Sequence, residues 1–127
     1  MTIGQVAERT GLSVHTLRFY EQEGLAAAPI ARDHRGRRLY REQDVEWLTV
    51  CIVLRRSGMP VREIRRYMSL VQAGTGNEEE RLGLLKRHQR RVEDQMNELQ
   101  KSLDLITEKI GIYEEHLARL RERSRDT

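Results

Sequence analysis

Apolar and polar residues in the first part of the chain alternate with the spacing of short amphipathic helices. Helices are predicted from Ile3 to Arg9 and from Val14 to about Glu23. Thr2 and Ser13 stand at the expected N-cap positions, and Gly11 can take the positive φ that ends a helix. A helix, a short turn with glycine and a second capped helix have helix-turn-helix spacing, although an ordinary helical hairpin has it too.

Residues 25–40 break the helical pattern and predict a short hairpin. Pro29 and Gly36 interrupt the helical spacing there, and a cluster of arginines occupies the tip: Arg32, Arg35, Arg37 and Arg38. Such a run is often only a solvated loop. Its position directly after the second helix favours a hairpin that faces an anion.

Two more helices are predicted before a glycine-containing linker. One runs from Glu42 to Ser57 with Val45, Leu48, Cys51, Ile52 and Leu54 on one face. Another starts at Met59-Pro60, because proline is tolerated in the first turn of a helix. Its inward residues are Ile64, Tyr67, Met68 and Val71, and its outward residues are Arg62, Arg65 and Arg66.

The last part of the chain carries a heptad repeat. The d positions are Leu85, Val92, Leu99, Ile106, Tyr113 and Leu120, and the a positions between them are Gln89, Met96, Leu103, Ile110 and Leu117. A helix from Leu85 to Leu120 would be about 54 Å long. So long a seam needs a second copy to cover it. Leu105 and Ile112 lie off the seam, either as scattered surface residues or as contacts to the first domain of the other subunit.

These patterns divide the chain into a domain over 1–73, a linker over 74–77, a coiled-coil helix over 78–122 and a tail over 123–127. Residues 1–76 contain 12 arginines and no lysine against 8 acidic residues, and arginine is the side chain that binds guanine and phosphate in a bidentate manner. No apolar run is long enough for a membrane span, and no signal peptide is found. One cysteine allows no internal disulfide and no cysteine-rich metal cage, so the expected location is the cytoplasm.

Several segments resemble, in register, the MerR family of transcription regulators. They are TIGQVA (Thr2–Ala7), GLS (Gly11–Ser13), TLRFYE (Thr16–Glu21), Gly24-Leu25, Arg38-Leu39-Tyr40, Asp44-Val45, Gly58-Met59 and Ile64. The resemblance covers about residues 2–72. Phe19 departs from it, because many members have a second tyrosine there. Pro60 departs as well, because it removes an N–H where the second wing usually meets the DNA backbone.

The resemblance implies a mainly α fold, with a winged helix-turn-helix domain followed by a long C-terminal helix that forms an antiparallel coiled coil. It also implies a homodimer on an inverted repeat of double-stranded promoter DNA. Family members bend and underwind promoters with a long spacer, so RNA polymerase is affected through the DNA. Bending costs on the order of 1–6 kcal/mol. We expect no cofactor, no metal and no membrane partner.

The resemblance also assigns DNA contacts. Thr16, Arg18 and Tyr20 lie on the recognition helix, Arg38 and Tyr40 belong to the wing, and His15 is a candidate base reader. The remaining candidates are Arg35, Arg37 and Arg62. The alternative function is a coiled-coil protein-interaction module, in which the basic hairpin binds an acidic partner. No set of residues indicates an enzyme.

The sequence does not identify an effector. Cys51 lies on an apolar helix face, which favours a buried thiol over a redox sensor. The four histidines lack metal-ligand spacing, and the regions where the family's metal sensors carry cysteines have none. A small effector near Tyr67, Val71 and Tyr113, or no effector at all, are the remaining interpretations.

Overall fold

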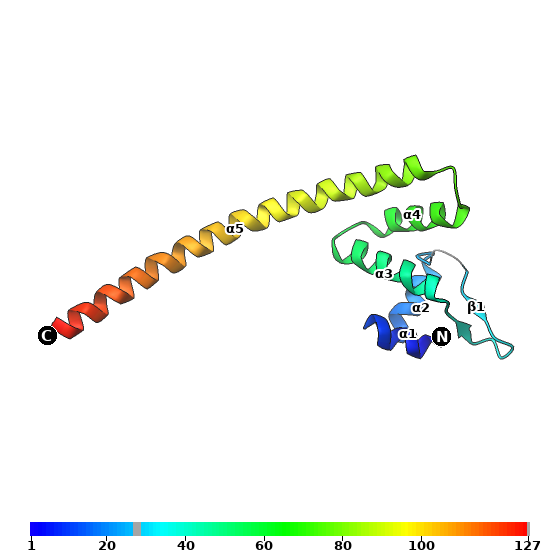
Figure 1. Cartoon of the computed structure of the whole chain (residues 1–127), viewed down its shortest axis with the longest axis horizontal. Helices are drawn as coiled ribbons and strands as arrows, with labels where there is room; N and C mark the ends of the chain where they lie inside the picture. The colour runs from blue at the N-terminus through cyan, green and yellow to red at the C-terminus, as the bar shows by residue number, and fades with distance from the viewer. Residues whose placement is uncertain (27–28, 127) are drawn as a thin grey trace. The chain divides into compact units, whose positions relative to one another are not determined.

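The computed structural model describes residues 1–26 and 29–126 of the chain. These residues form two units, Met1–His88 and the helical segment after His88. The first unit holds four helices, a short hairpin and the first turns of a fifth helix (Figure 1). The family's expected mainly helical fold is confirmed.

The helix-turn-helix consists of α1 (Ile3–Thr10) and α2 (Val14–Gln22), close to the predicted bounds. Thr2 and Gln5 cap α1 reciprocally, with the Gln5 N–H donating to Thr2 Oγ1 at 3.2 Å and the Thr2 N–H donating to Gln5 Oε1 at 2.8 Å. Gly11 ends the helix with a φ of 74°. Ser13 then caps α2 through the Thr16 N–H at 3.0 Å, as predicted.

The predicted hairpin forms from two short antiparallel strands, β1 (Ala31–Arg32) and β2 (Arg38–Leu39). Ala31 pairs with Leu39 and Arg32 pairs with Arg38. Gly36 occupies the turn with a φ of 79°, a backbone conformation that glycine adopts without strain. The hairpin is therefore a small wing beside the helix-turn-helix.

Two helices close the core of the first unit: α3 (Glu42–Arg56) and α4 (Val61–Ala73). The predicted apolar face of α3 is buried throughout, and α4 contributes Ile64, Tyr67, Met68 and Leu70. Pro60 is the N-cap residue just before α4, whereas the prediction placed it in the first turn of the helix. Its missing N–H costs nothing in either position, since both precede the intrahelical hydrogen bonds.

The fifth helix, α5, runs from Glu78 to Asp126. It begins where the linker was predicted to end, but it continues through residues that were expected to form a tail after 122. Arg123 and Arg125 lie in its last turn, where positive charge favours the helix C-terminus. Within the described residues, no helix is long and apolar enough to cross a membrane.

Candidate nucleic-acid interface

The recognition helix α2 presents one polar face to solvent. His15, Arg18 and Gln22 are exposed on this face at helical spacing, whereas Leu17 and Tyr20 face the core. The Thr16 hydroxyl lies 2.9 Å from the Ser13 hydroxyl, so it is partly used in capping the helix. Gln22 was not among the predicted contacts, although its i+4 spacing from Arg18 would have indicated it.

The two tyrosines that were predicted to contact DNA lie mostly inside the core. Tyr20 and Tyr40 are each only 4% exposed, because their rings fill the core beneath α2 and the hairpin. Burial raises the pKa of both phenols, so each hydroxyl keeps its proton and remains a donor. With so little surface exposed, neither ring can stack on a base, and a contact with phosphate would have to use the phenol hydroxyl.

Asp33 organises the tip of the hairpin, a role that sequence reasoning missed. Its Oδ1 accepts the N–H groups of Arg35 and Arg37, both at 2.9 Å, and its Oδ2 accepts Arg37 Nε at 3.0 Å. These hydrogen bonds lower the pKa of the Asp33 carboxyl, with the Arg37 backbone N–H as the largest cause. An aspartate three residues before Gly36 is typical of such turns and was the available signal.

Glu21 joins the recognition helix to both strands of the wing. Its carboxylate forms ion pairs with Arg32 of β1 at 3.3 Å and with Arg38 of β2 at shorter range. Arg32 also donates to the Gly36 carbonyl oxygen at 3.0 Å. Arg38 is therefore held in place and partly covered, whereas Arg35 and Arg37 are exposed at the tip.

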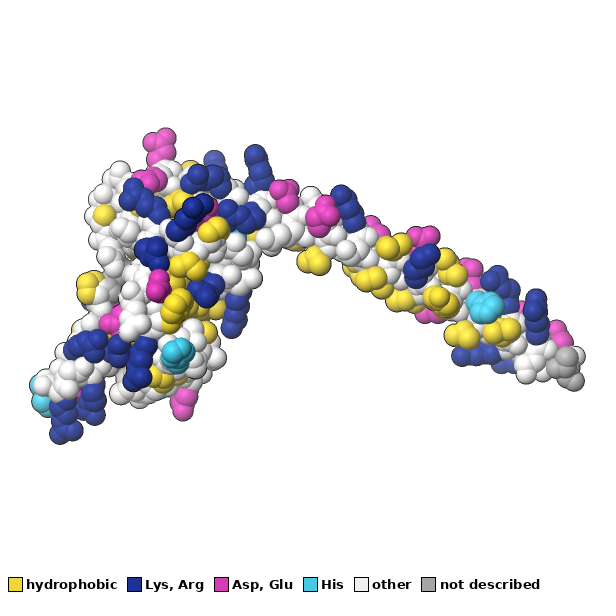
Figure 2. Space-filling view, turned by 180° about the vertical axis from the view of Figure 1, so that it is seen from behind, with side chains coloured by type: hydrophobic (Ala, Val, Ile, Leu, Met, Phe, Trp, Pro, Cys, Tyr) yellow, Lys and Arg dark blue, Asp and Glu magenta, His cyan; other side chains and the backbone are white. Residues whose placement is uncertain are grey.

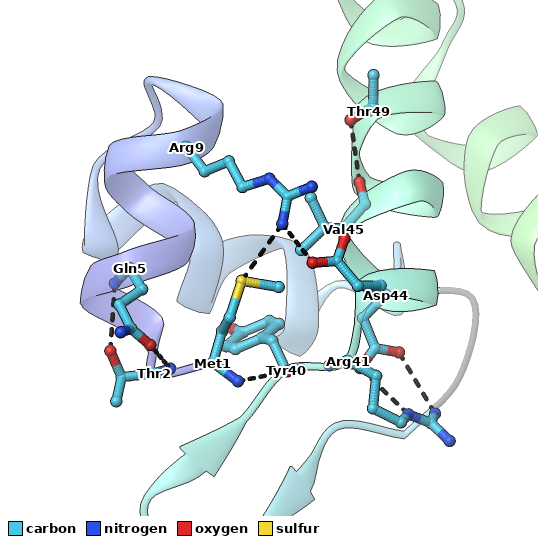
Figure 3. A network of polar contacts seen from close by, with 10 residues as sticks. Met1, Thr2, Gln5, Arg9, Tyr40, Arg41, Asp44, Val45 and Thr49 are labelled. Carbon is cyan, nitrogen blue, oxygen red and sulfur yellow. Dashed lines mark hydrogen bonds and ion pairs between the residues drawn. The ribbon is translucent and has the colours of Figure 1, made fainter.

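The first residue of the chain ties the wing to the start of α1 (Figure 3). The Met1 amino group donates to the Tyr40 carbonyl oxygen at 2.7 Å, and the Tyr40 N–H donates to the Met1 carbonyl oxygen at 2.7 Å. Next to this pair, Arg9 contacts Glu42 at 2.6 Å. The base of the wing is thereby fixed against both α1 and α3.

A groove runs between the recognition helix and the wing. It has a volume of about 570 Å³ and is lined by Thr2, Ile3, Arg18, Asp33, Gly36, Arg37, Arg38 and Leu39. Figure 2 shows basic side chains gathered at the hairpin end of the first unit. The structure thus brings Arg18, Arg37 and Arg38 to one surface, as a polyanion backbone would require.

Residues of α3 and α4 support the recognition helix from behind. The Arg55 guanidinium lies over the Phe19 ring, 5.3 Å from its centroid, and 5.7 Å from that of Tyr20. Arg65 donates to the Glu23 carbonyl oxygen at 2.6 Å and to its carboxylate at 2.8 Å. Arg62 is exposed on α4, as predicted.

Cys51 is fully buried in the core, as predicted, and burial raises its pKa to about 11. Its thiol is therefore not activated. Of the residues considered for an effector, Tyr67 is buried against Trp47. Val71 lines a hollow of about 380 Å³ with Pro29, Arg41, Gln43, Asp44, Trp47 and Gln72. No cluster of possible metal ligands occurs among the described residues.

The predicted seam of α5 is a stripe of exposed apolar side chains (Figure 2). The exposed fractions of its residues range from 44% to 69%. The stripe consists of Met96, Leu99, Leu103, Ile106, Ile110, Tyr113, Leu117 and Leu120. Leu85 differs from the prediction because it packs partly against the core of its own unit. Leu82, which is 50% exposed, lies one heptad before Gln89 and was not included in the predicted seam.

Comparisons with known proteins agree with this geometry. The family model described as "MerR HTH family regulatory protein" matches residues 1–70, and the model described as "MerR, DNA binding" matches residues 45–109. An HTH-type transcriptional regulator of Haemophilus influenzae is 35% identical over 89% of this chain and 83% of its own length.

Two crystal structures are similar as well. A MerR family transcriptional regulator from Listeria monocytogenes has a TM-score of 0.91 and 30% identity, over 99% of this chain and 95% of that one. HiNmlR, a MerR family regulator that lacks the sensor domain and is bound to promoter DNA, has a TM-score of 0.81 and 35% identity, over 92% of each chain. This chain belongs to the MerR family of DNA-binding transcription regulators.

Proposed function

We propose that this regulator acts as a homodimer on an inverted repeat in promoter DNA, through an antiparallel coiled coil of α5. The observation that carries the proposal is that one chain has two such surfaces. They are an arginine-lined groove beside a recognition helix and a long uncovered apolar seam. Two copies related by a two-fold axis would present two recognition helices, which match two half-sites.

The DNA-contacting surface has two parts with different roles. Arg18, His15 and Gln22 are exposed on α2, where side chains can reach base edges in the major groove. Arg35 and Arg37 on the wing, together with Arg62 on α4, supply positive charge for phosphates. The hydroxyls of Thr16, Tyr20 and Tyr40 add neutral donors, and Arg38 faces the same groove while it is paired with Glu21.

The effect on transcription is proposed to come from deforming the promoter. Bending and underwinding a promoter with a long spacer would bring its two polymerase-binding elements into register, so RNA polymerase would be affected through DNA alone. Transcription from such a promoter should depend on the protein, and shortening the spacer to the usual length should remove this dependence. Equal dependence at both spacer lengths would contradict the deformation mechanism.

A gel-shift titration with Arg18→Ala tests the recognition surface. We expect operator affinity to fall at least about tenfold, equivalent to about 1.4 kcal/mol, because Arg18 is the central exposed cation of α2. Since Arg18 is placed at base edges and not at phosphates, the slope of affinity against salt concentration should change little.

Arg66→Ala is the matched control, since it removes the same charge from an exposed arginine that pairs with Glu80 at 2.7 Å. It should leave operator affinity nearly unchanged. Equal losses from both variants would mean that only the net charge matters. An unchanged affinity with Arg18→Ala would place the recognition surface elsewhere.

A further inference from the structure

The apolar seam of α5 begins before Gln89, the first residue of the second unit. Leu82 occupies an a position one heptad before Gln89, and half of its surface is exposed. The a positions are thus Leu82, Gln89, Met96, Leu103, Ile110 and Leu117, and the d positions run from Leu85 to Leu120. A second copy of the chain can therefore contact α5 along nearly its whole length.

An antiparallel coiled coil packs each a residue against a d residue of the other helix, so only registers one heptad apart are allowed. We propose that the two copies of α5 pair about a two-fold axis beside Lys101, so that Leu99 of each chain packs against Leu103 of the other. This register rests on the antiparallel dimer proposed above and specifies which residues meet within it.

The apolar residues match best in this register. Its contacts are Leu99 with Leu103, Met96 with Ile106, Val92 with Ile110, Gln89 with Tyr113, Leu85 with Leu117, and Leu82 with Leu120. The one polar seam residue, Gln89, meets the side chain that can satisfy it, the Tyr113 hydroxyl. The exposed Leu82 gains an apolar partner, and both helices overlap from Glu78 to the last turns.

Charged residues beside the seam favour the same register. In an antiparallel pair each e residue faces an e residue of the other helix, and these contacts influence partner orientation. Lys86 then faces Glu114, and Glu79 faces Arg121, all four of which are exposed. On the other side of the seam g residues face g residues, which brings one like-charged pair together, Arg81 with Arg123. This pair lies near the helix ends, and Arg81 already contacts Glu78 at 3.1 Å.

Sliding one helix by one heptad worsens both the apolar and the charged contacts. In one direction Glu93 faces Glu114, Lys86 faces Arg121, and Gln89 meets Leu120. In the other direction Glu79 faces Glu114, while Gln89 meets Ile106 and Leu117 meets Glu78. Each shift therefore introduces like charges and leaves the polar Gln89 against an aliphatic side chain.

Chemical crosslinking measures the register directly. The g positions Gln95, Ser102 and Lys109 are each replaced by cysteine in the full chain, and the proteins are treated alone and in pairs with a short bis-maleimide. Cys51 is fully buried and should not react. In the proposed register Ser102→Cys links to itself, and Gln95→Cys links to Lys109→Cys.

Other outcomes separate the possible failures. A slide of one heptad, about 10.5 Å, would instead link Ser102→Cys to Lys109→Cys or to Gln95→Cys. Self-linking of Ile110→Cys, a seam position far from the proposed axis, would indicate parallel helices. Either result overturns the register while the dimer stands, whereas a monomer in sedimentation experiments would overturn the dimer itself.

Charge reversal gives an independent test whose sign depends on the register. Lys86→Glu should raise the dissociation constant of the dimer about tenfold, since two symmetric attractive pairs become repulsive, and adding Glu114→Lys should restore it. Lys101 is an f position, on the side of the helix that faces away from the seam. Lys101→Glu therefore makes the same charge change there and should have little effect on the dissociation constant. In the register where Lys86 faces Arg121, Lys86→Glu would instead strengthen the dimer, which would overturn the proposal.

Discussion

Glu21 joins the recognition helix to the wing through its single carboxylate, in the candidate nucleic-acid interface. It contacts arginines from both strands of the wing, and it lies on the recognition helix itself. Because the wing strands are only two residues long, their own pairing gives them little rigidity. The orientation of the wing against α2 therefore depends strongly on this acidic side chain.

Replacing Glu21 by glutamine should separate positioning from charge. The variant gains net positive charge, which by itself would strengthen binding to any DNA. Loss of the wing's anchor should nevertheless weaken operator binding about tenfold, or about 1.4 kcal/mol, without weakening binding to random-sequence DNA. Fluorescence anisotropy with both DNAs measures the ratio of the affinity for the operator to the affinity for random-sequence DNA.

Glu46→Gln on the exposed side of α3 is the control for the change in charge. It should raise or preserve both affinities equally. If Glu21→Gln behaves like Glu46→Gln on both DNAs, the carboxylate does not position the wing.

Cys51 predicts a specific dependence of stability on pH. Burial raises the pKa of its thiol from 9.0 to about 11, so the folded state keeps a proton that the unfolded state loses in this interval. The stabilisation is complete below about pH 9 and is lost as the pH rises toward 11, a loss of about 2 kcal/mol.

Cys51→Val isolates this contribution, because the tyrosines titrate in both proteins. Urea unfolding at pH 8 and pH 11 should show that the wild type loses about 2 kcal/mol more than the variant. Equal losses would mean that the Cys51 thiol is not buried as described. DNA binding at neutral pH should be unaffected by the substitution, since the thiol is in the core.

Most elements of the first unit could be predicted from the sequence because each carries its own local signal. Thr2, Ser13 and Gly11 mark helix ends through hydrogen bonds to nearby backbone or through a positive φ. Gly36 marks the hairpin turn for the same reason. The burial of Cys51 followed from helical periodicity alone, since a single amphipathic face determines it.

Features that depend on tertiary contacts could not be predicted in this way. The rings of Tyr20 and Tyr40 are buried by elements distant in sequence, and the ion pairs of Glu21 join α2 to strands further along the chain. Leu85 continues the heptad pattern, yet it also packs against the core of its own unit. A heptad indicates a buried face without specifying what covers it.

Gly111, in the interior of α5, gives a test at the level of the helix. A Cβ at Gly111 would meet nothing within 4 Å, so Gly111→Ala should stabilise the helix by about 1 kcal/mol. Thermal unfolding followed by circular dichroism should show a higher midpoint. Gly36→Ala also has open space, but its φ of 79° makes alanine strained, so it should lower the midpoint. A decrease with Gly111→Ala would contradict a continuous α5.

At the level of the whole molecule, one chain carries both the surface proposed to contact DNA and the apolar stripe proposed to pair with a second copy. The groove between α2 and the wing is formed within residues 1–88. The apolar stripe of α5 is exposed in a single copy, and a stripe of this length is costly to leave uncovered in water. Dimerisation would cover the stripe and double the DNA contacts at the same time.

The proposed binding of a homodimer to an inverted repeat is tested most directly by the stoichiometry of the complex with DNA. Sedimentation velocity would compare the protein with a duplex that carries the full inverted repeat, identified by footprinting, and with a duplex that carries one half-site. We predict two chains on the full repeat at micromolar concentration, and we predict that Leu103→Arg, which places a charge in the seam, loses this complex. One wild-type chain on the full repeat, or an unaltered complex with Leu103→Arg, would contradict the account.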